Sequence, residues 1–396
     1  MTDNSKYFEK YILNNNVEVP GRLVIPPLTL FSSNPDGTLS DGERKYLELR
    51  GTGVGLYILG ASAVSQKGIA FPCQPRSFSE KDIESNKERA KIIKSQGALA
   101  INQIHHGGAL AKRQYSGVSP VAPSSEIANQ NLAKQGPVSE EDKVKELTDS
   151  EIKKLIDDFA NATEISLKAG YDGIEIHGAN NYLIQQFYSP YTNRRTDDWG
   201  GSVEKRMNFP LKIVDACCKV KEKYNRPDFI IGYRLSPEEP FEPGITMTET
   251  IQLVKALVQK PIQFIHISQK NFFQKTRRGE GTGTERLKVI HELTKGKVAL
   301  IGVGGLKTQQ NFTYAINTGF TEFVAAGVAS MINRDLGILL KENKGDQLQL
   351  ELDPEHPEKY AFSTPLWNFC LSDHGLDFFP PVKGKVSKKP PTNFLV

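Results

Sequence analysis

The sequence predicts an α/β protein whose core is one (β/α)8 barrel. Short runs of branched apolar residues alternate with longer amphipathic stretches about eight times along the 396 residues. Each short run is mostly apolar on both faces, which is typical of parallel strands that helices cover. Glycines and polar residues follow the carboxyl ends of these runs, where barrels of this kind place their sites. Together these observations favour repeated strand–helix units that close into a barrel.

The expected strands and helices alternate along the chain. Strands are expected at residues 22–28, 55–60, 99–105, 173–178, 229–235, 264–268, 298–304 and 322–327. Helical patterns lie between them, at residues 79–96, 147–170, 203–224, 246–259 and 307–318. The pattern at 147–170 is the clearest. Thr148 or Asp149 can cap its start, an apolar stripe runs along it, and Gly170 can end it.

The chain is longer than a barrel requires. A (β/α)8 barrel needs about 250 residues, so we expect one barrel domain over residues 1–349 that carries insertions. The largest insertion is expected at 107–146 and a second at 271–285, both after strands and therefore on the carboxyl-end face. Residues 350–396 look irregular, and we expect them to pack on the barrel or on a partner.

Composition excludes several classes of protein. The formal net charge of +4 is too small to indicate nucleic-acid binding, and much of the excess lies in the tail at 383–391. The four cysteines show no metal or redox spacing, which fits a reducing, cytoplasmic compartment. No apolar run approaches the ~20 residues that span a bilayer, and the N-terminus has no apolar signal region. We therefore expect a cytoplasmic protein without nucleic-acid or membrane partners.

Familiar cofactor motifs are missing. The run GTGVGL at 51–56 ends in Leu56 where a dinucleotide fold needs glycine, and His291 stands where a phosphate-binding loop needs glycine. His105, His106 and His177 have no carboxylate or cysteine clustered with them in sequence, so we expect no metal site.

Polar residues at the strand ends suggest a different cofactor. Gly304, Gly305 and Gly327 can offer backbone N–H groups at strands 7 and 8, the usual phosphate position of this fold. Arg234 is a fixed cation, and Gln103 can donate and accept hydrogen bonds at once. Such groups suit a planar ring with an amide-like edge that gains negative charge, as reduced flavin does.

The stretch after strand 4 offers groups for a substrate carbonyl. His177 and Asn180 can each donate a hydrogen bond to one oxygen and stabilise an enolate. Tyr182, with an ordinary pKa of about 10, stays protonated at neutral pH and can act as a general acid. Structural explanations exist for each residue: a strand-end histidine, a core tyrosine, a loop-capping Gln103, turn glycines, and a buried ion pair of Arg234 with Glu175 or Glu238.

Longer motifs resemble a known family. The run AGYDGIEIHGANNYLIQQFYSPYTNRRTDDWGGSVEKRMNF at 169–209 is similar to the signature of the Old Yellow Enzymes, FMN-dependent ene-reductases. The likeness extends through GRLVIPPLTL, GASAV, NQIHHGG, GYRLSP, VGG and AAGVA and covers roughly residues 5–345.

The resemblance implies a barrel with non-covalent FMN and NADH or NADPH as the reductant. It places Thr29, with Pro27 and Leu28, near the flavin O4 and N5 edge. Further implied flavin contacts are Ala61 and Gln103 on the ring, Arg234 beside N1 and O2, and Gly304, Gly305, Gly327 and Val328 around the phosphate. His177 and Asn180 would bind the substrate carbonyl and Tyr182 would give the proton.

The implied reaction is a ping-pong hydride transfer to the C=C bond of an α,β-unsaturated carbonyl compound. Two alternatives remain open. One is a reductase or oxidase of quinones, nitro compounds or oxygen, and the other is a flavin-binding protein with little turnover. The protein would be a monomer or a homodimer.

The sequence also departs from the family pattern. The family usually has arginine after the strand-8 glycine, and Val328 stands there. Arginine is also common after the third-strand motif, where this chain has Ala109. No cysteine cluster or second dinucleotide-binding domain follows, so the chain resembles the short, single-domain members.

Overall fold

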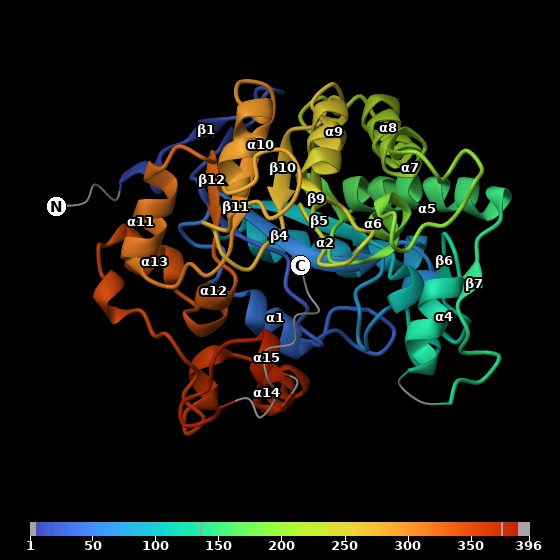
Figure 1. Ribbon diagram of the computed structural model, residues 1–396. Coiled ribbons are helices and arrows are strands. Elements are labelled where there is room, and N and C mark those ends of the chain that lie inside the picture. The colour runs from blue at the N-terminus through green and yellow to red at the C-terminus, as the bar shows by residue number, and fades with distance from the viewer. Residues whose placement is uncertain (1–4, 135–136, 374, 387–396) are drawn as a thin grey trace.

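The computed structural model describes residues 5–134, 137–373 and 375–386, and it shows a closed barrel of eight parallel strands (Figure 1). The strand order around the barrel is β10-β11-β12-β3-β4-β5-β8-β9. All eight predicted strands are confirmed: β3 (Leu23–Ile25), β4 (Leu56–Ala63), β5 (Leu99–His105), β8 (Gly173–Gly178), β9 (Ile230–Leu235), β10 (Phe264–Ile267), β11 (Ala299–Val303) and β12 (Phe323–Ala325).

Helices surround the strands. The predicted ones appear as α2 (Ile83–Lys94), α5 (Asp149–Lys168), α7 (Val203–Arg206) with α8 (Asn208–Lys223), α9 (Met247–Leu257) and α11 (Gln309–Asn317). Thr148, not Asp149, caps α5. Its side chain accepts from the backbone N–H of Glu151, and the Glu151 carboxylate accepts from the backbone N–H of Thr148. The chain turns out of α5 at Gly170, whose φ of +82° favours glycine.

One barrel helix was missed by the sequence analysis. Helix α10 (Arg286–Thr294) follows the insertion after β10. Glu285 stands at its N-cap without a side-chain cap, and its buried face includes Arg286, His291 and Thr294. A helix that lacks a capping residue and mixes polar groups into its buried stripe gives a weak amphipathic pattern.

The barrel interior is packed and closed at its amino-terminal end. A cluster of buried side chains that includes Val24, Ile58, Ile101 and Phe264 fills it. A hairpin of β1 (Tyr11–Ile12) and β2 (Glu18–Val19) packs against that cluster, and the amide of Asn14 donates to the carbonyls of Ile262 and Lys297. The opposite, carboxyl-end face is therefore the side on which a site can form.

The insertions and the C-terminal segment add smaller elements. Residues 107–146 contain α3 (Arg113–Ser116), α4 (Glu126–Ala133) and β6 (Val121–Ala122), which pairs with β7 (Lys145–Glu146). Three further helices belong to the barrel region: α1 (Asp41–Leu47), α12 (Val328–Ile332) and α13 (Leu336–Lys341). Residues 350–386 are not wholly irregular, because they contain α14 (Thr364–Leu371) and α15 (Gly375–Phe378). Among the described residues, no helix is long and apolar enough to cross a membrane.

Candidate active site

Strand register brings the predicted polar residues together at one end of the barrel. His177 of β8 lies opposite Arg234 of β9, and Arg234 lies opposite His266 of β10. On the other side, Gln103 of β5 lies opposite Glu175 of β8. These five side chains therefore occupy neighbouring positions on four adjacent strands, as the barrel prediction required.

Glu175 organises the buried polar layer of this end. One carboxylate oxygen accepts from Nε2 of Gln103 at 2.7 Å, and the other lies 2.7 Å from Nδ1 of His266. Glu175 and His266 are fully buried. A carboxylate buried this deeply must be hydrogen-bonded, and here two neighbouring strands supply the partners.

Arg234 does not form the ion pair that was considered as its structural explanation. Glu175 is engaged by Gln103 and His266, and Glu238 pairs with Arg286 at 2.7 Å. Within the described part of the chain, the buried Nε of Arg234 has no hydrogen-bond partner. Burial lowers the pKa of Arg234, and the charge of Glu175 opposes that shift. An unpaired buried guanidinium group is a site for a ligand acceptor.

Gly60 allows the ends of β3, β4 and β5 to approach closely. A Cβ atom at this position would lie 2.4 Å from Cβ of Pro27 and 2.8 Å from Oε1 of Gln103. The next residue, Ala61, is buried, and its carbonyl accepts from Gln74. Pro27, Ala61 and Gln103 therefore share one wall, while Leu28 and Thr29 continue half-buried along the loop after β3.

His177 is placed as a neutral hydrogen-bond donor. Its Nδ1 accepts from the backbone N–H of Ala179 at 3.4 Å, which leaves the proton on Nε2. Burial lowers the pKa of His177 well below its usual value, and the neighbouring His105, Arg234 and His266 add to the shift. The imidazole is therefore neutral at physiological pH, and its Nε2–H can donate to a ligand.

Asn180 and Tyr182 lie beside His177. Asn180 has a φ of +58°, which asparagine tolerates, and its backbone N–H donates to Oγ of Ser236. Oγ of Ser268 donates to Oδ1 of Asn180 at 2.7 Å, so the amide nitrogen is the group left to donate outward. The rings of Tyr182 and His177 pack edge to face with centroids 5.2 Å apart. Burial raises the pKa of Tyr182, which keeps its hydroxyl protonated.

His105 belongs to the same cluster. Its ring meets that of Tyr182 edge to face at 4.2 Å, and its Nδ1 lies 3.0 Å from Nε2 of Gln74. Because Gln74 donates there, the proton of His105 resides on Nε2, which has no partner among the described residues. Burial lowers the pKa of His105 to about 3. The described residues contain no cluster of groups that could hold a metal ion.

The glycines at the ends of β11 and β12 are neighbours in the sheet. Val303 of β11 pairs with Ala325 of β12, so Gly304 and Gly327 follow adjacent strand ends. Gly304 has a φ of +129° and leaves no room for a Cβ beside the backbone of Asn271. A Cβ on Gly327 would lie 3.5 Å from Pro26 and 3.8 Å from Leu28, in ordinary contact.

The remaining two predicted residues lie beside these glycines. Val328 begins α12, so it has a backbone N–H at the start of a helix and no charge on its side chain. Gly305 is exposed on the surface.

A cavity of about 680 Å³ lies along the chain segment that follows β8. Asn181, the neighbour of Asn180, lines it together with Gln186 and residues of the 107–146 insertion, including α4. The stacked rings of Tyr191 and Phe241, 4.3 Å apart, also line it. The largest insertion therefore shares a cavity with the chain segment that directly follows Asn180.

Several functional neighbours escaped the sequence analysis. Gln74 bonds Ala61, and Ser236 and Ser268 bond Asn180, while His266 bonds Glu175, which in turn holds Gln103; each lies far from its partner in sequence. Ser236 and His266 are close to strand ends that were identified, so the strand assignments alone held a signal for them. Gln74 stands in a loop and carried none.

The closed eight-stranded barrel, with polar side chains gathered at the carboxyl ends of its strands, has the architecture of a (β/α)8-barrel enzyme. The match to known proteins gives the family. The model of the NADH:flavin oxidoreductase / NADH oxidase family matches residues 10–347, and the chain belongs to this family, that of the Old Yellow Enzymes.

Similar proteins support that assignment. The chain is 38% identical over 377 residues to YqiG, a probable NADH-dependent flavin oxidoreductase of Bacillus subtilis. The alignment covers 94% of this chain and 98% of that protein. The chain is 32% identical to an NADH:fumarate oxidoreductase of Klebsiella pneumoniae over 94% of this chain but only 39% of that protein. The structure of the Old Yellow Enzyme homologue from Zymomonas mobilis superposes with a TM-score of 0.74 at 24% identity, covering 90% of this chain and 99% of that one.

Membership fixes the general chemistry. The protein is an NAD(P)H-dependent flavin oxidoreductase whose cofactor is FMN. The residues present fit that cofactor, because the buried Nε of Arg234 has no hydrogen-bond partner among the described residues.

Proposed function

We propose that the protein reduces the C=C bond of α,β-unsaturated carbonyl compounds, with NADH or NADPH as the reductant. The observation that carries the proposal is the grouping of two neutral donors, His177 and Asn180, with the protonated Tyr182. Each donor is oriented by a hydrogen bond on its other side, from Ala179 and from Ser268. Donors fixed in this way stabilise charge as it develops on a carbonyl oxygen.

The roles of the residues follow from this geometry. Nε2–H of His177 and the Asn180 amide would donate to one carbonyl oxygen and draw electron density away from the β-carbon. FMN, when bound, supplies the hydride for that carbon. The Tyr182 hydroxyl would give its proton to the α-carbon, and burial, which raises its pKa, keeps that proton in place beforehand. Because these groups lie beside one another at one end of the barrel, reductant and substrate would bind in turn.

We further propose the roles of the flavin-contacting residues. Arg234 would face the ring edge that gains negative charge, and Gln103 would offer it an acceptor, since the Gln103 amide nitrogen is bound to Glu175. Pro27, Leu28, Thr29 and Ala61 would line the other edge. Backbone N–H groups of Gly304, Gly305, Gly327 and Val328 would bind the phosphate.

Charge narrows the substrate class. The imidazoles of His105 and His177 are neutral, so the carbonyl site offers donors without a positive charge. That favours uncharged enones and enals over unsaturated carboxylates. The Klebsiella relative is named for fumarate and a Vibrio harveyi relative for acrylate, both carboxylates with an activated C=C bond, but the matched part is 39% and 35% of those proteins. What fumarate and acrylate share with the proposed enone and enal substrates is the activated C=C bond.

The test is anaerobic turnover with NADH and NADPH. We expect 2-cyclohexen-1-one to be reduced at its double bond, and fumarate more slowly. Menadione and oxygen serve as acceptors that do not need carbon protonation. Turnover with menadione or oxygen and none with any enone would favour the quinone reductase or oxidase. A protein that binds FMN and is not reduced by either nucleotide would favour a binding function.

A further inference from the structure

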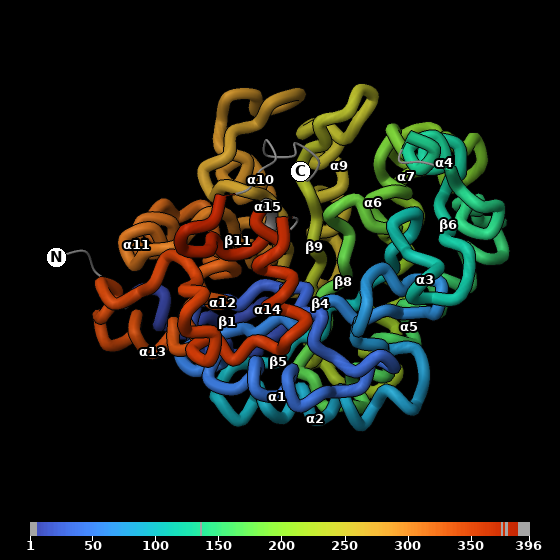
Figure 2. Tube along the Cα trace, turned by 90° about the horizontal axis from the view of Figure 1, so that it is seen from below, coloured from blue at the N-terminus to red at the C-terminus, as the bar shows by residue number. Residues whose placement is uncertain are grey.

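The C-terminal segment, residues 350–386, lies on the same side of the barrel as the site. Figure 2 looks from below, and α14 and α15 cross beside the strands there, while Figure 1 shows both helices below the barrel. The segment follows the 10–347 range that the family model matches. It therefore lies beyond the part of the chain that the family model matches.

Buried polar contacts anchor the segment to the barrel. The guanidinium group of Arg50, which is 2% exposed, donates to the carbonyl of Tyr360 at 2.6 Å and to that of Ser330 in α12 at 3.1 Å. Ser363, the N-cap of α14, lies 2.6 Å from the hydroxyl of Ser32. A Cβ on Gly42 in α1 would come within 2.9 Å of Ser363, so glycine there allows the close approach.

Aromatic rings connect this segment to the proposed catalytic residues. The ring of Phe369 lies 4.5 Å from that of Phe31, and the ring of Phe379 lies 6.3 Å from it. Phe31 meets Phe71 edge to face at 5.9 Å. Phe71 in turn lies 6.3 Å from His105, whose ring packs on Tyr182. A continuous arc of rings thus runs from the C-terminal segment to the proton donor.

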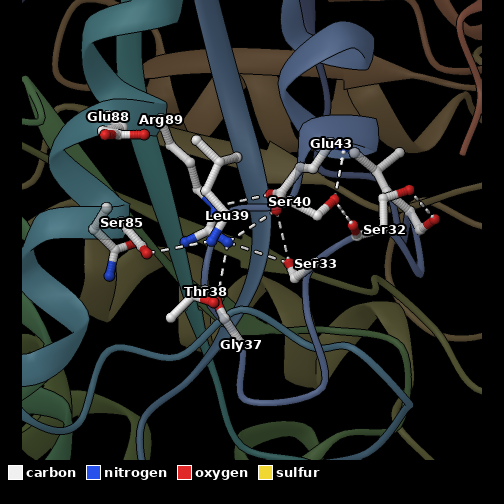
Figure 3. Close-up of polar contacts among 12 residues, drawn as sticks. Ser32, Ser33, Gly37, Thr38, Leu39, Ser40, Glu43, Ser85, Glu88 and Arg89 are labelled. Atoms are coloured by element: carbon white, nitrogen blue, oxygen red, sulfur yellow. Dashed lines mark hydrogen bonds and ion pairs between the residues drawn. The ribbon is translucent and has the colours of Figure 1, made fainter.

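Phe31 lies in the middle of this series of rings, between Phe71 of the barrel and the two phenylalanines of the C-terminal segment. Its φ of +51° is rare for a bulky residue. On the barrel side, Ser33 donates to Glu43 at 2.8 Å, and the buried Arg89 bonds both Glu43 and Ser33 (Figure 3). On the other side, the phenylalanines of the C-terminal segment pack against its ring.

We propose that the C-terminal segment is part of the substrate site, and that Phe369 and Phe379 fix Phe31 as an aromatic wall that sets the size of the substrate's apolar substituent. Phe31 follows Thr29 by two residues on the loop after β3, and its ring packs on Phe71, which lies beside His105, so a shift of the Phe31 ring would be passed to that position through Phe71. The wall is apolar, so it selects the hydrocarbon part of the substrate. The choice of substrates below rests on the proposed function.

The test compares a bulky ligand with a small one. The variant Phe369→Ala/Phe379→Ala removes both supporting rings. Trp367→Ala is the matched control, because this aromatic residue is in the same helix but stacks on Tyr360 at 5.9 Å. The measurements are kcat/KM for 4-phenyl-3-buten-2-one and 2-cyclohexen-1-one, and dissociation constants for 4-phenylphenol and phenol, all on the FMN-loaded protein.

We expect the bulky-to-small ratio to rise about tenfold in the double variant and to change less than about twofold in the control. A ratio within about twofold of the parent in the double variant overturns the proposal. If the double variant does not fold, Phe369→Leu/Phe379→Leu is measured against the same limit. Absence of enone turnover in the parent would contradict the proposed function alone, because the two phenols still report the wall.

Discussion

The side-chain amide of Gln103 donates to the carboxylate of Glu175 across 2.7 Å, and both side chains are buried in the polar layer at the carboxyl end of the barrel. This bond fixes the orientation of Gln103. Its nitrogen is directed to Glu175, and its oxygen faces the position where a Cβ of residue 60 would stand. Glu175, a residue that the sequence suggested was structural, therefore decides what Gln103 offers to a ligand.

Replacing this carboxylate should affect both stability and cofactor binding. In Glu175→Gln, the new amide accepts through only one oxygen, so Gln103 and an Nδ1–H of His266 can no longer both donate to this side chain. Leaving a buried polar group unsatisfied should lower the free energy of unfolding by about 1–3 kcal/mol. FMN affinity should fall with it, because Gln103 is no longer held and Arg234 loses a balancing charge. Urea unfolding and flavin titration of the apoprotein measure the two effects.

Glu164→Gln is the control for this change. Glu164 pairs with lysines at the protein surface, where such pairs contribute at most about 1 kcal/mol. The contrary result is a free energy of unfolding of Glu175→Gln that is as close to that of the parent as the control's is. That result would show that the polar layer does not stabilise the barrel.

Buried histidines should make the protein sensitive to mild acid. Burial lowers the pKa of His105 and of His106 to about 3, below the usual value of 6.5. The unfolded chain therefore binds protons below about pH 6.5 that the folded protein does not. Stability should fall as the pH drops from about 6.5 towards 3, by up to about 1.4 kcal/mol per pH unit for each such histidine.

His106→Asn isolates one of these contributions. Nδ1 of His106 accepts from the N–H of Gly108, and an asparagine oxygen can take that bond without titrating. Urea unfolding between pH 5 and 7 should give a shallower loss of stability in this variant than in the parent. The exposed His356 provides the control substitution, and an equal slope in all three proteins would contradict the expectation.

The barrel was predictable because its signal is local. Strands such as Gly173–Gly178 are apolar on both faces, and Thr148 with Glu151 marks a helix start within four residues. Strand ends then placed His177, Gln103 and Arg234 on one side, since parallel strands share that edge.

Other parts of the site depend on long-range contacts. Ser268 orients Asn180 from 88 residues away, and Gln74 orients His105 from a loop without a pattern. Phe31 meets Phe369 across more than three hundred residues, and nothing in either local sequence indicates the other. Such pairings arise only when the chain has closed into the barrel.

Removing the proton donor should separate two reactions. Tyr182→Phe keeps the ring against His105 and His177 but loses the hydroxyl. Reduction of 2-cyclohexen-1-one should slow by about 10²–10⁴-fold, because the α-carbon loses its acid. Reduction of menadione should stay within about threefold of the parent, because its oxygens take protons from solvent. Steady-state rates of the variant and the parent with both acceptors test this role. An equal loss of rate with each acceptor would assign Tyr182 a structural role.

Removing a carbonyl donor should weaken ligand binding without loss of FMN. His177→Ala deletes the Nε2–H group, and the loss of one donor to a developing oxyanion should slow enone reduction by about 10²–10³-fold. Affinity for phenol should fall as well, since the phenolate oxygen uses the same donors. His177→Asn retains an N–H group near that position and should recover part of both losses. If the alanine variant reduced enones and bound phenol as the parent does, the substrate carbonyl would have to bind elsewhere on the rim.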